Sequence, residues 1–91
     1  MLFMAQMQVN LPPDMPAEIA DKLKSDEKAL AQRLQREGKW VHLWRVAGRY
    51  ANVSIFDVAD NDELHTLISS LPLFPYMDVQ VTALARHPSA I

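Results

Sequence analysis

The sequence predicts an α+β domain of the ferredoxin-like class, an antiparallel sheet with two helices on one face. The first observation is the order of the patterns: segments with apolar residues at every second position and segments with helical spacing follow one another as βαββαβ. The second is size, because 91 residues, 49% of them hydrophobic, form one globular domain over residues 1–91.

The first strand and the first helix are expected before residue 38. The odd positions from Phe3 to Leu11 are all apolar, which is the period of a strand with one buried face. Pro12 and Pro13 end this strand, since proline cannot continue a hydrogen-bonded ladder. A helix should then begin at Asp14 or at the pair 15–16, with Pro16 in its first turn, and run to about Glu37. Gly38 is the expected stop.

A hairpin, a second helix and a last strand follow. Strands are expected over residues 39–47 and 50–58, joined by a two-residue turn at Gly48–Arg49. Asp60 with Glu63 three residues later resembles a capping box, so a helix should run from there to about residue 71. The proline-bounded loop LPLFPY covers residues 71–76, and the fourth strand is expected over 78–85.

The hairpin turn fixes which side chains share a face. A two-residue turn pairs Ala47 with Tyr50 and the preceding residues in step. The side chains predicted on one face are Arg45, Tyr50, Asn52 and Ser54, together with Val41, Leu43 and Phe56. The face predicted opposite carries Trp40, His42, Trp44, Val46, Ala51, Val53 and Ile55. The polar four therefore form one cluster, which either meets solvent or lines a site.

One acid of the first helix is placed to face that cluster. Ile19, Leu23, Leu30 and Leu34 form the expected core stripe, with Asp26 and Glu27 on its two borders. Asp26 lies on a charged flank with Lys22 and Arg33. Glu27 lies near residues that offer no charge, namely Ala20, Leu23, Ala31 and Leu34. Glu27 is thus the acid expected between helix and sheet, where burial would raise its pKa toward that of a general base. The alternative is a boundary glutamate that reaches water.

Composition excludes several classes of protein. The chain has no cysteine, which removes disulfides and thiolate chemistry. Its net charge is −2 with no basic run, so neither a nucleic-acid surface nor a polybasic membrane patch is predicted. The histidines lack metal-ligand spacing: His42 lies between tryptophans and His65 at the edge of the second helix's stripe. The apolar stretch at the start is short and carries no basic region, so a cytoplasmic location is expected.

So small a domain buries little of its surface, and the sheet face without helices needs a cover. A partner subunit is the expected cover, as in dimeric α+β barrels.

Several long stretches resemble a known family. LKSDEKALAQRLQREGKWVHLWRVAGRYANVSIFDV, DELHTLISSLPLFPYMDV and ARHP are similar to muconolactone delta-isomerase over nearly the whole chain. LWRVAGRYANVSIFDV and LPLFPYMDV are the most specific parts. Some relatives carry histidine and a basic residue at the positions of Met4 and Gln6 here.

The resemblance implies both an activity and an assembly. The family has a ferredoxin-like fold, forms a homodecamer from sheet-to-sheet dimers, and works in the catechol branch of the 3-oxoadipate pathway. It converts muconolactone to 3-oxoadipate enol-lactone with no cofactor or metal. Two alternatives remain: a dehalogenase acting on chloromuconolactone, and a non-catalytic module that binds a small acid.

The implied reaction assigns roles to the residues singled out above. Glu27 is expected to be the base that moves the proton. Arg45 is expected either to hold the substrate's carboxylate or to stabilise the dienolate. Tyr50, Asn52 and Ser54 are expected to donate hydrogen bonds to the lactone oxygens, and the further candidates are Lys22 and His65.

Overall fold

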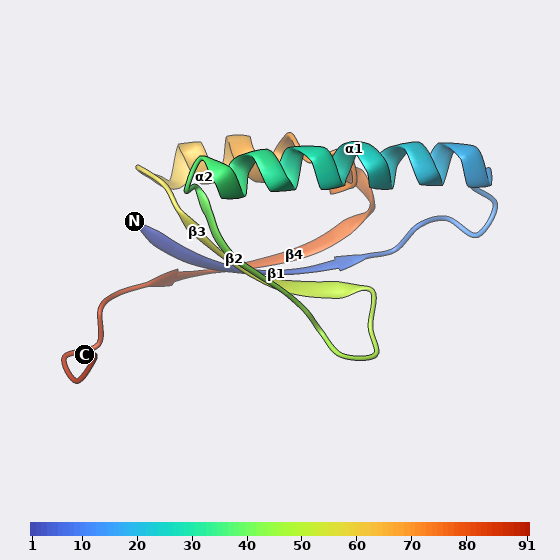
Figure 1. Cartoon of the computed structure of the whole chain (residues 1–91). Helices are drawn as coiled ribbons and strands as arrows, with labels where there is room; N and C mark the ends of the chain where they lie inside the picture. Colours follow the sequence, from blue (N-terminus) through green and yellow to red (C-terminus); the bar gives the residue numbers. More distant parts are fainter.

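A computed structural model describes all residues, 1–91, and has the predicted order of elements (Figure 1). The strands are β1 (Leu2–Val9), β2 (Trp40–Arg45), β3 (Ala51–Asp57) and β4 (Met77–Leu84), and the helices are α1 (Ala17–Arg36) and α2 (Asn61–Ser69). A short 3₁₀ helix covers Phe74–Tyr76. The strands form one sheet in the order β2-β3-β1-β4, with every pair antiparallel. The predicted ferredoxin-like class is confirmed.

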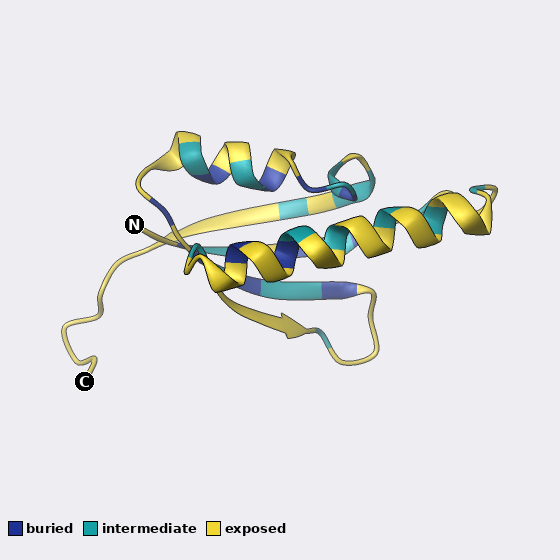
Figure 2. Cartoon of the chain, turned by 45° about the horizontal axis from the view of Figure 1, so that its top comes forward, coloured by how far each residue is buried: buried dark blue, intermediate teal, exposed yellow.

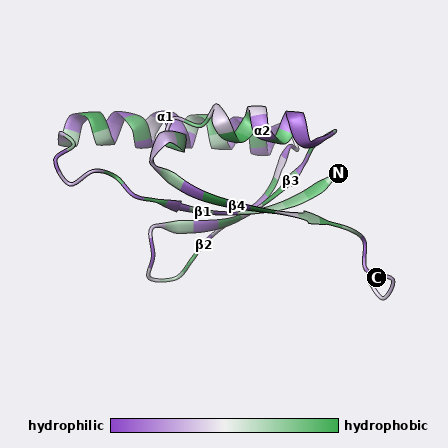
Figure 3. Cartoon of the chain, turned by 180° about the vertical axis from the view of Figure 1, so that it is seen from behind, coloured by the Kyte–Doolittle hydropathy of each residue, from purple (hydrophilic) through white to green (hydrophobic).

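Both helices lie on the same face of the sheet, and the other face has no covering element (Figures 1 and 3). The predicted alternation of β1 decides this arrangement: Phe3, Ala5, Met7 and Val9 are all buried toward the helices. Phe3 pairs with Phe56 and Ala5 with Ser54 in the register with β3. Phe56 and Ser54 therefore also face the helices.

The start and end of α1 follow local chemistry. The helix begins one residue after Pro16, which occupies the cap position with a ψ of 140° and is not in the first turn as expected. At the other end Gly38 adopts a φ of +77°, and the N–H of Lys39 donates to the carbonyl of Leu34 at 3.0 Å. This is the glycine-terminated hydrogen-bond pattern that commonly closes helices.

The buried stripe of α1 covers only part of the helix. Ala31 and Leu34 are buried, whereas Ile19 is 50% exposed, so its predicted place in the core stripe is wrong. Figure 2 shows the buried positions gathered in the C-terminal half of α1. The N-terminal half of α1 contributes no buried residue to the core.

The two strands of the hairpin pair in the predicted register, but the turn that joins them differs from the predicted one. Arg45 pairs with Asn52 and Leu43 with Ser54, as expected. The turn, however, is closed by the N–H of Arg49 donating to the carbonyl of Val46 at 3.1 Å, and the next pair is Val46 with Ala51. Gly48 takes a φ of +79° inside this longer loop. The register survives because both turns place the same residues opposite each other.

Trp40 lies on the face opposite to the predicted one. The pairing shifts between Trp40 and His42, so Val41 is an additional residue in β2. Such a bulge reverses the alternation of side chains on one side of it. Trp40 consequently faces the helices and is 2% exposed. Its ring packs against that of Phe56 in a tilted arrangement, with ring centroids 4.8 Å apart.

Candidate active site

A cavity of about 510 Å³ lies between α1 and the hairpin. Glu27, Arg45, Tyr50 and Asn52, four of the predicted site residues, line it. A second hollow of about 570 Å³, which Gln6, Gln8 and Arg49 border, belongs to the uncovered side of the sheet. The first cavity is the better candidate because it contains Glu27, a carboxyl whose pKa is raised by burial.

That side chain is Glu27. Partial burial raises its pKa above the ordinary value of 4.5, and a hydrogen bond from the backbone of Leu73 lowers it in part. The competing acid, Asp26, is exposed and pairs with Lys22 at 3.0 Å. The prediction that Glu27, and not Asp26, faces the sheet is confirmed.

The proline-bounded loop after α2 holds the Glu27 carboxylate. The N–H of Leu73 donates to Oε1 of Glu27 at 3.0 Å. Leu71 and Leu73 are both buried, so the loop is anchored on the core and its N–H has a fixed direction. One carboxylate oxygen is thereby oriented by the backbone, and Oε2 has no hydrogen-bond partner in the protein.

The polar face of the hairpin supplies the opposite wall. Ser54 is completely buried and does not line the cavity. Its hydroxyl instead donates to Oδ1 of Asn52 at 2.8 Å. This bond occupies the amide oxygen and leaves the Asn52 amide NH₂ without a partner. The Ser54 hydroxyl is therefore not at the cavity surface, in contrast to the expected position, and is connected to the cavity through Asn52.

Two further predicted residues lie away from this cavity. Lys22 is largely exposed and paired with Asp26, because its position on α1 is turned roughly 140° from that of Glu27 at 100° per residue. His65 borders a separate hollow of about 370 Å³ between α2 and β4. The structure brings neither side chain together with Glu27.

The cavity also contains residues that sequence reasoning missed. Lys24 and Lys28 of α1 line it, as does Trp40, whose indole N–H is buried without a partner. Lys24 precedes Glu27 by three residues, a spacing that places two side chains on one helix face and was available as a signal. The inward position of Trp40 had no such signal, because it depends on the bulge.

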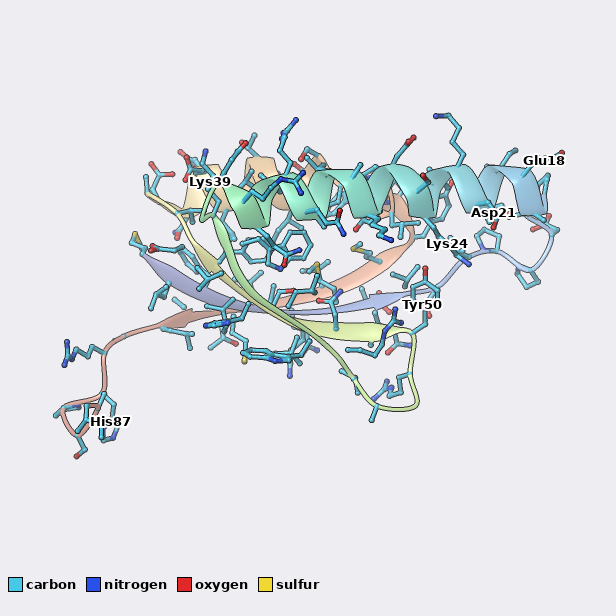
Figure 4. The ribbon with its side chains drawn as sticks, viewed as in Figure 1. Glu18, Asp21, Lys24, Lys39, Tyr50 and His87 are labelled. Carbon is cyan, nitrogen blue, oxygen red and sulfur yellow. The ribbon has the colours of Figure 1, made fainter.

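Tyr50 brings the two walls together. Nζ of Lys24 lies 5.5 Å from the centroid of the Tyr50 ring, and Cζ of Arg45 lies 5.2 Å from it. Figure 4 shows the Lys24 side chain reaching from α1 toward Tyr50. The arrangement combines a half-buried base, hydrogen-bond donors and three cations around one space. It is suited to moving a proton on a small anionic molecule.

No three His, Asp or Glu side chains come together in a way that could hold a metal ion. Neither helix has the length and apolarity needed to cross a membrane.

Comparisons with known proteins give the family. The family model of muconolactone delta-isomerase matches residues 1–90. The chain is 65% identical to Muconolactone Delta-isomerase 2 of Acinetobacter lwoffii, over all of this chain and 95% of that protein. It is also 65% identical to the Muconolactone Delta-isomerase of Cupriavidus pinatubonensis, over all of this chain and 99% of the relative.

A solved structure agrees with this assignment. The crystal structure of a muconolactone isomerase matches with a TM-score of 0.96 and 60% identity, covering all of this chain and 95% of the other. This match covers the whole chain, so it includes the helix, hairpin and loop that form the cavity. This chain belongs to the muconolactone delta-isomerase family.

Proposed function

We propose that this chain isomerises muconolactone to 3-oxoadipate enol-lactone and that Glu27 moves the proton. The observation that carries the assignment of the base is the Glu27 carboxylate: partly buried, with a raised pKa, and held by the Leu73 N–H at 3.0 Å inside the cavity. Substrate and product contain the same atoms and the same number of electrons. The chemistry therefore requires only the removal and return of a proton.

The reaction shifts one double bond of the lactone ring. Glu27 removes the proton from the carbon gamma to the lactone carbonyl, and the electron pair of that C–H bond moves into the ring. The result is a dienolate with negative charge on the carbonyl oxygen. Protonated Glu27 then returns the proton to the alpha carbon, which leaves the double bond between the beta and gamma carbons. A raised pKa suits a group that must both accept and donate a proton.

The dienolate oxygen requires donors that are already in place. The Asn52 amide NH₂ is free for this role because Ser54 occupies the amide oxygen. The Tyr50 hydroxyl belongs to the same cavity and is the second donor. The carboxymethyl group of the substrate requires a cation, and Arg45 lines the same wall.

An ultraviolet assay of the purified chain with muconolactone tests this proposal. Isomerisation breaks the conjugation between the ring double bond and the carbonyl, so absorbance should fall with time. Tight binding of muconolactone without conversion would contradict the proposal and support a non-catalytic binding module. Chloride release from chloromuconolactone without turnover of muconolactone would support the dehalogenase.

We also propose that copies of the chain associate through the uncovered sheet face, into dimers that build a homodecamer in the cytoplasm. The apolar side chains on that face support association: Trp44 is 55% exposed, Leu2 44% and Leu84 40%. Apolar groups so exposed are typical of a surface that a partner covers.

A further inference from the structure

Two cations from opposite walls of the cavity approach one aromatic ring. Lys24 comes from α1 and Arg45 from β2, and both charged groups lie over the Tyr50 ring, at 5.5 and 5.2 Å from its centroid. A cation–π contact contributes only about 0.5–1 kcal/mol at an exposed site. A bound carboxylate that reaches these cations would form charge-assisted hydrogen bonds, which are stronger.

The protein itself supplies no such anion. Three other cations of the chain have acidic partners, Lys22 with Asp26, Arg33 with Glu37 and Lys39 with Glu63, whereas Arg36, Arg49 and Arg86 have none. Lys24, Lys28 and Arg45 form no ion pair, although the chain has 11 acids for nine lysines and arginines. The cavity thus contains three cations and one carboxylate, and that carboxylate is bonded to the Leu73 N–H.

The cations Lys24 and Arg45 are more exposed to solvent than the proposed base, Glu27. Lys24, Arg45 and Tyr50 are exposed, whereas Glu27 and Asn52 are partly buried and Trp40 is fully buried. A ligand that enters this space therefore meets the positive charges at the mouth and the base further inside. In muconolactone the carboxylate is separated by one methylene from the carbon that loses the proton, so a carboxylate at the mouth points the reacting carbon inward.

We infer that Lys24 and Arg45 form a carboxylate clamp over Tyr50, and that Lys24 is a specificity-determining residue that selects lactones carrying a free carboxylate. The inference rests on the proposed function, since it names what the same cavity recognises. It also assigns Arg45 to the substrate's carboxylate and leaves the dienolate oxygen to Asn52 and Tyr50.

Binding of an unreactive ligand tests the clamp apart from turnover. The probe is the saturated analogue of muconolactone, in which the ring double bond is reduced, used as the free acid and as its methyl ester. Calorimetry should show that Lys24→Met weakens binding of the acid by about tenfold, as for the loss of one charge-assisted contact. Binding of the ester should not change, and Lys24→Arg should restore most of the affinity for the acid.

Two control variants sharpen the result. Lys28→Met removes the same charge from the same cavity, without a contact to Tyr50, and should cause a much smaller loss. Lys22→Met removes a lysine that lies outside the cavity and should leave binding unchanged. An equal loss for Lys24→Met and Lys28→Met would overturn the clamp in favour of a diffuse positive potential. So would an equal loss for acid and ester.

The clamp and the proposed function can fail separately. If the native chain converts muconolactone but Lys24→Met binds acid and ester as the native chain does, the clamp is wrong and the isomerase assignment stands. If the native chain converts no muconolactone but prefers the saturated acid over its ester in a Lys24-dependent way, the isomerase assignment is wrong and the clamp stands.

Discussion

At the scale of single residues, the partial burial of Glu27 destabilises the folded protein and also makes the carboxylate a better base. Its carboxylate is partly removed from water, and its only hydrogen bond from the protein comes from the Leu73 N–H. Burial of this kind disfavours the charged form, which is why the pKa rises. The same property makes the carboxylate a stronger base than an exposed glutamate would be.

Replacing Glu27 by Gln should remove the proton acceptor while preserving the shape of the cavity. We expect kcat for muconolactone to fall by about 10²–10⁴, the usual contribution of general-base catalysis. Asp26→Asn is the matched control, since Asp26 is the neighbouring acid and lies outside the cavity. Near-native turnover in Glu27→Gln would show that another group is the base.

The raised pKa of Glu27 predicts a pH profile. Because the base must be ionised, kcat/KM should fall on the acid side with an apparent pKa above 4.5. An apparent pKa at or below 4.5 would contradict the assignment.

The same shift predicts how stability changes with pH. A carboxyl whose pKa is raised on folding stabilises the folded state fully below its unfolded pKa, and this contribution is lost as pH rises through the folded pKa. The neutral variant Glu27→Gln should therefore unfold at a higher temperature than the native chain at neutral pH. The difference should disappear well below pH 4.5.

Ser54 offers a test of positioning through a second residue. Its buried hydroxyl donates to Asn52 at 2.8 Å, so Ser54→Ala should cost about 1 kcal/mol of unfolding free energy. Release of the Asn52 amide should also lower kcat/KM several-fold, without a change in its pH dependence. Ser25→Ala, an exposed position on α1, is the control for both measurements. If Ser54→Ala lowered the unfolding free energy but left kcat/KM unchanged, Ser54 would have no role in positioning Asn52.

At the scale of elements, the caps and the bulge decide where functional side chains lie. The predicted capping box at α2 forms, with Asp60 accepting from the N–H of Glu63 at 2.8 Å. The Glu63 carboxylate in turn accepts from the N–H of Ala59 at 3.1 Å, and not from the N–H of the cap residue as in the usual capping box. In β2 the additional residue Val41 turns Trp40 inward, where it forms the inner end of the cavity.

Asp60→Ala should destabilise the fold by about 1 kcal/mol, the usual cost of losing a helix cap. Asp62→Ala, in the same turn but without a capping bond, should cost less. Denaturant unfolding checks both. Because α2 borders the other hollow, activity per folded molecule should be unchanged in each variant. A loss of kcat in Asp60→Ala would mean that α2 affects the position of Glu27.

At the scale of the whole molecule, the two faces of the sheet differ in what covers them. The helices bury the face of Phe3 and Phe56, while His42 and Trp44 stack on the uncovered side with ring centroids 4.9 Å apart. Figure 1 shows that the C-terminal segment leaves the sheet and does not fold back over this side. No helix or strand of residues 1–91 covers this side of the sheet.

Trp44→Glu should place a charge on the uncovered face, on the edge strand β2, and reduce the size of the assembly. Light scattering after gel filtration measures this directly. Ala29→Glu adds the same charge on an exposed position of α1 and should leave the assembly unchanged. A native assembly size in Trp44→Glu would exclude this face as the contact surface.

The sequence by itself determined the features that depend on local periodicity and on the pairing of two strands across a short turn. The order of elements, the buried face of β1, the hairpin register and the inward position of Glu27 all follow from spacing along the chain. Each of these features depends on a regular spacing of residues along the chain, and such a spacing can be recognised in the sequence alone.

Only the tertiary structure decided the contacts between segments far apart in the chain. The Leu73 N–H reaches Glu27 across 46 positions, Lys24 meets Tyr50 across the cavity, and the Val41 bulge brings Trp40 inside. None of these has a period, because each depends on how a loop, a helix and a strand end are packed against one another. The sequence could therefore indicate the base, and only the packing could show what surrounds it.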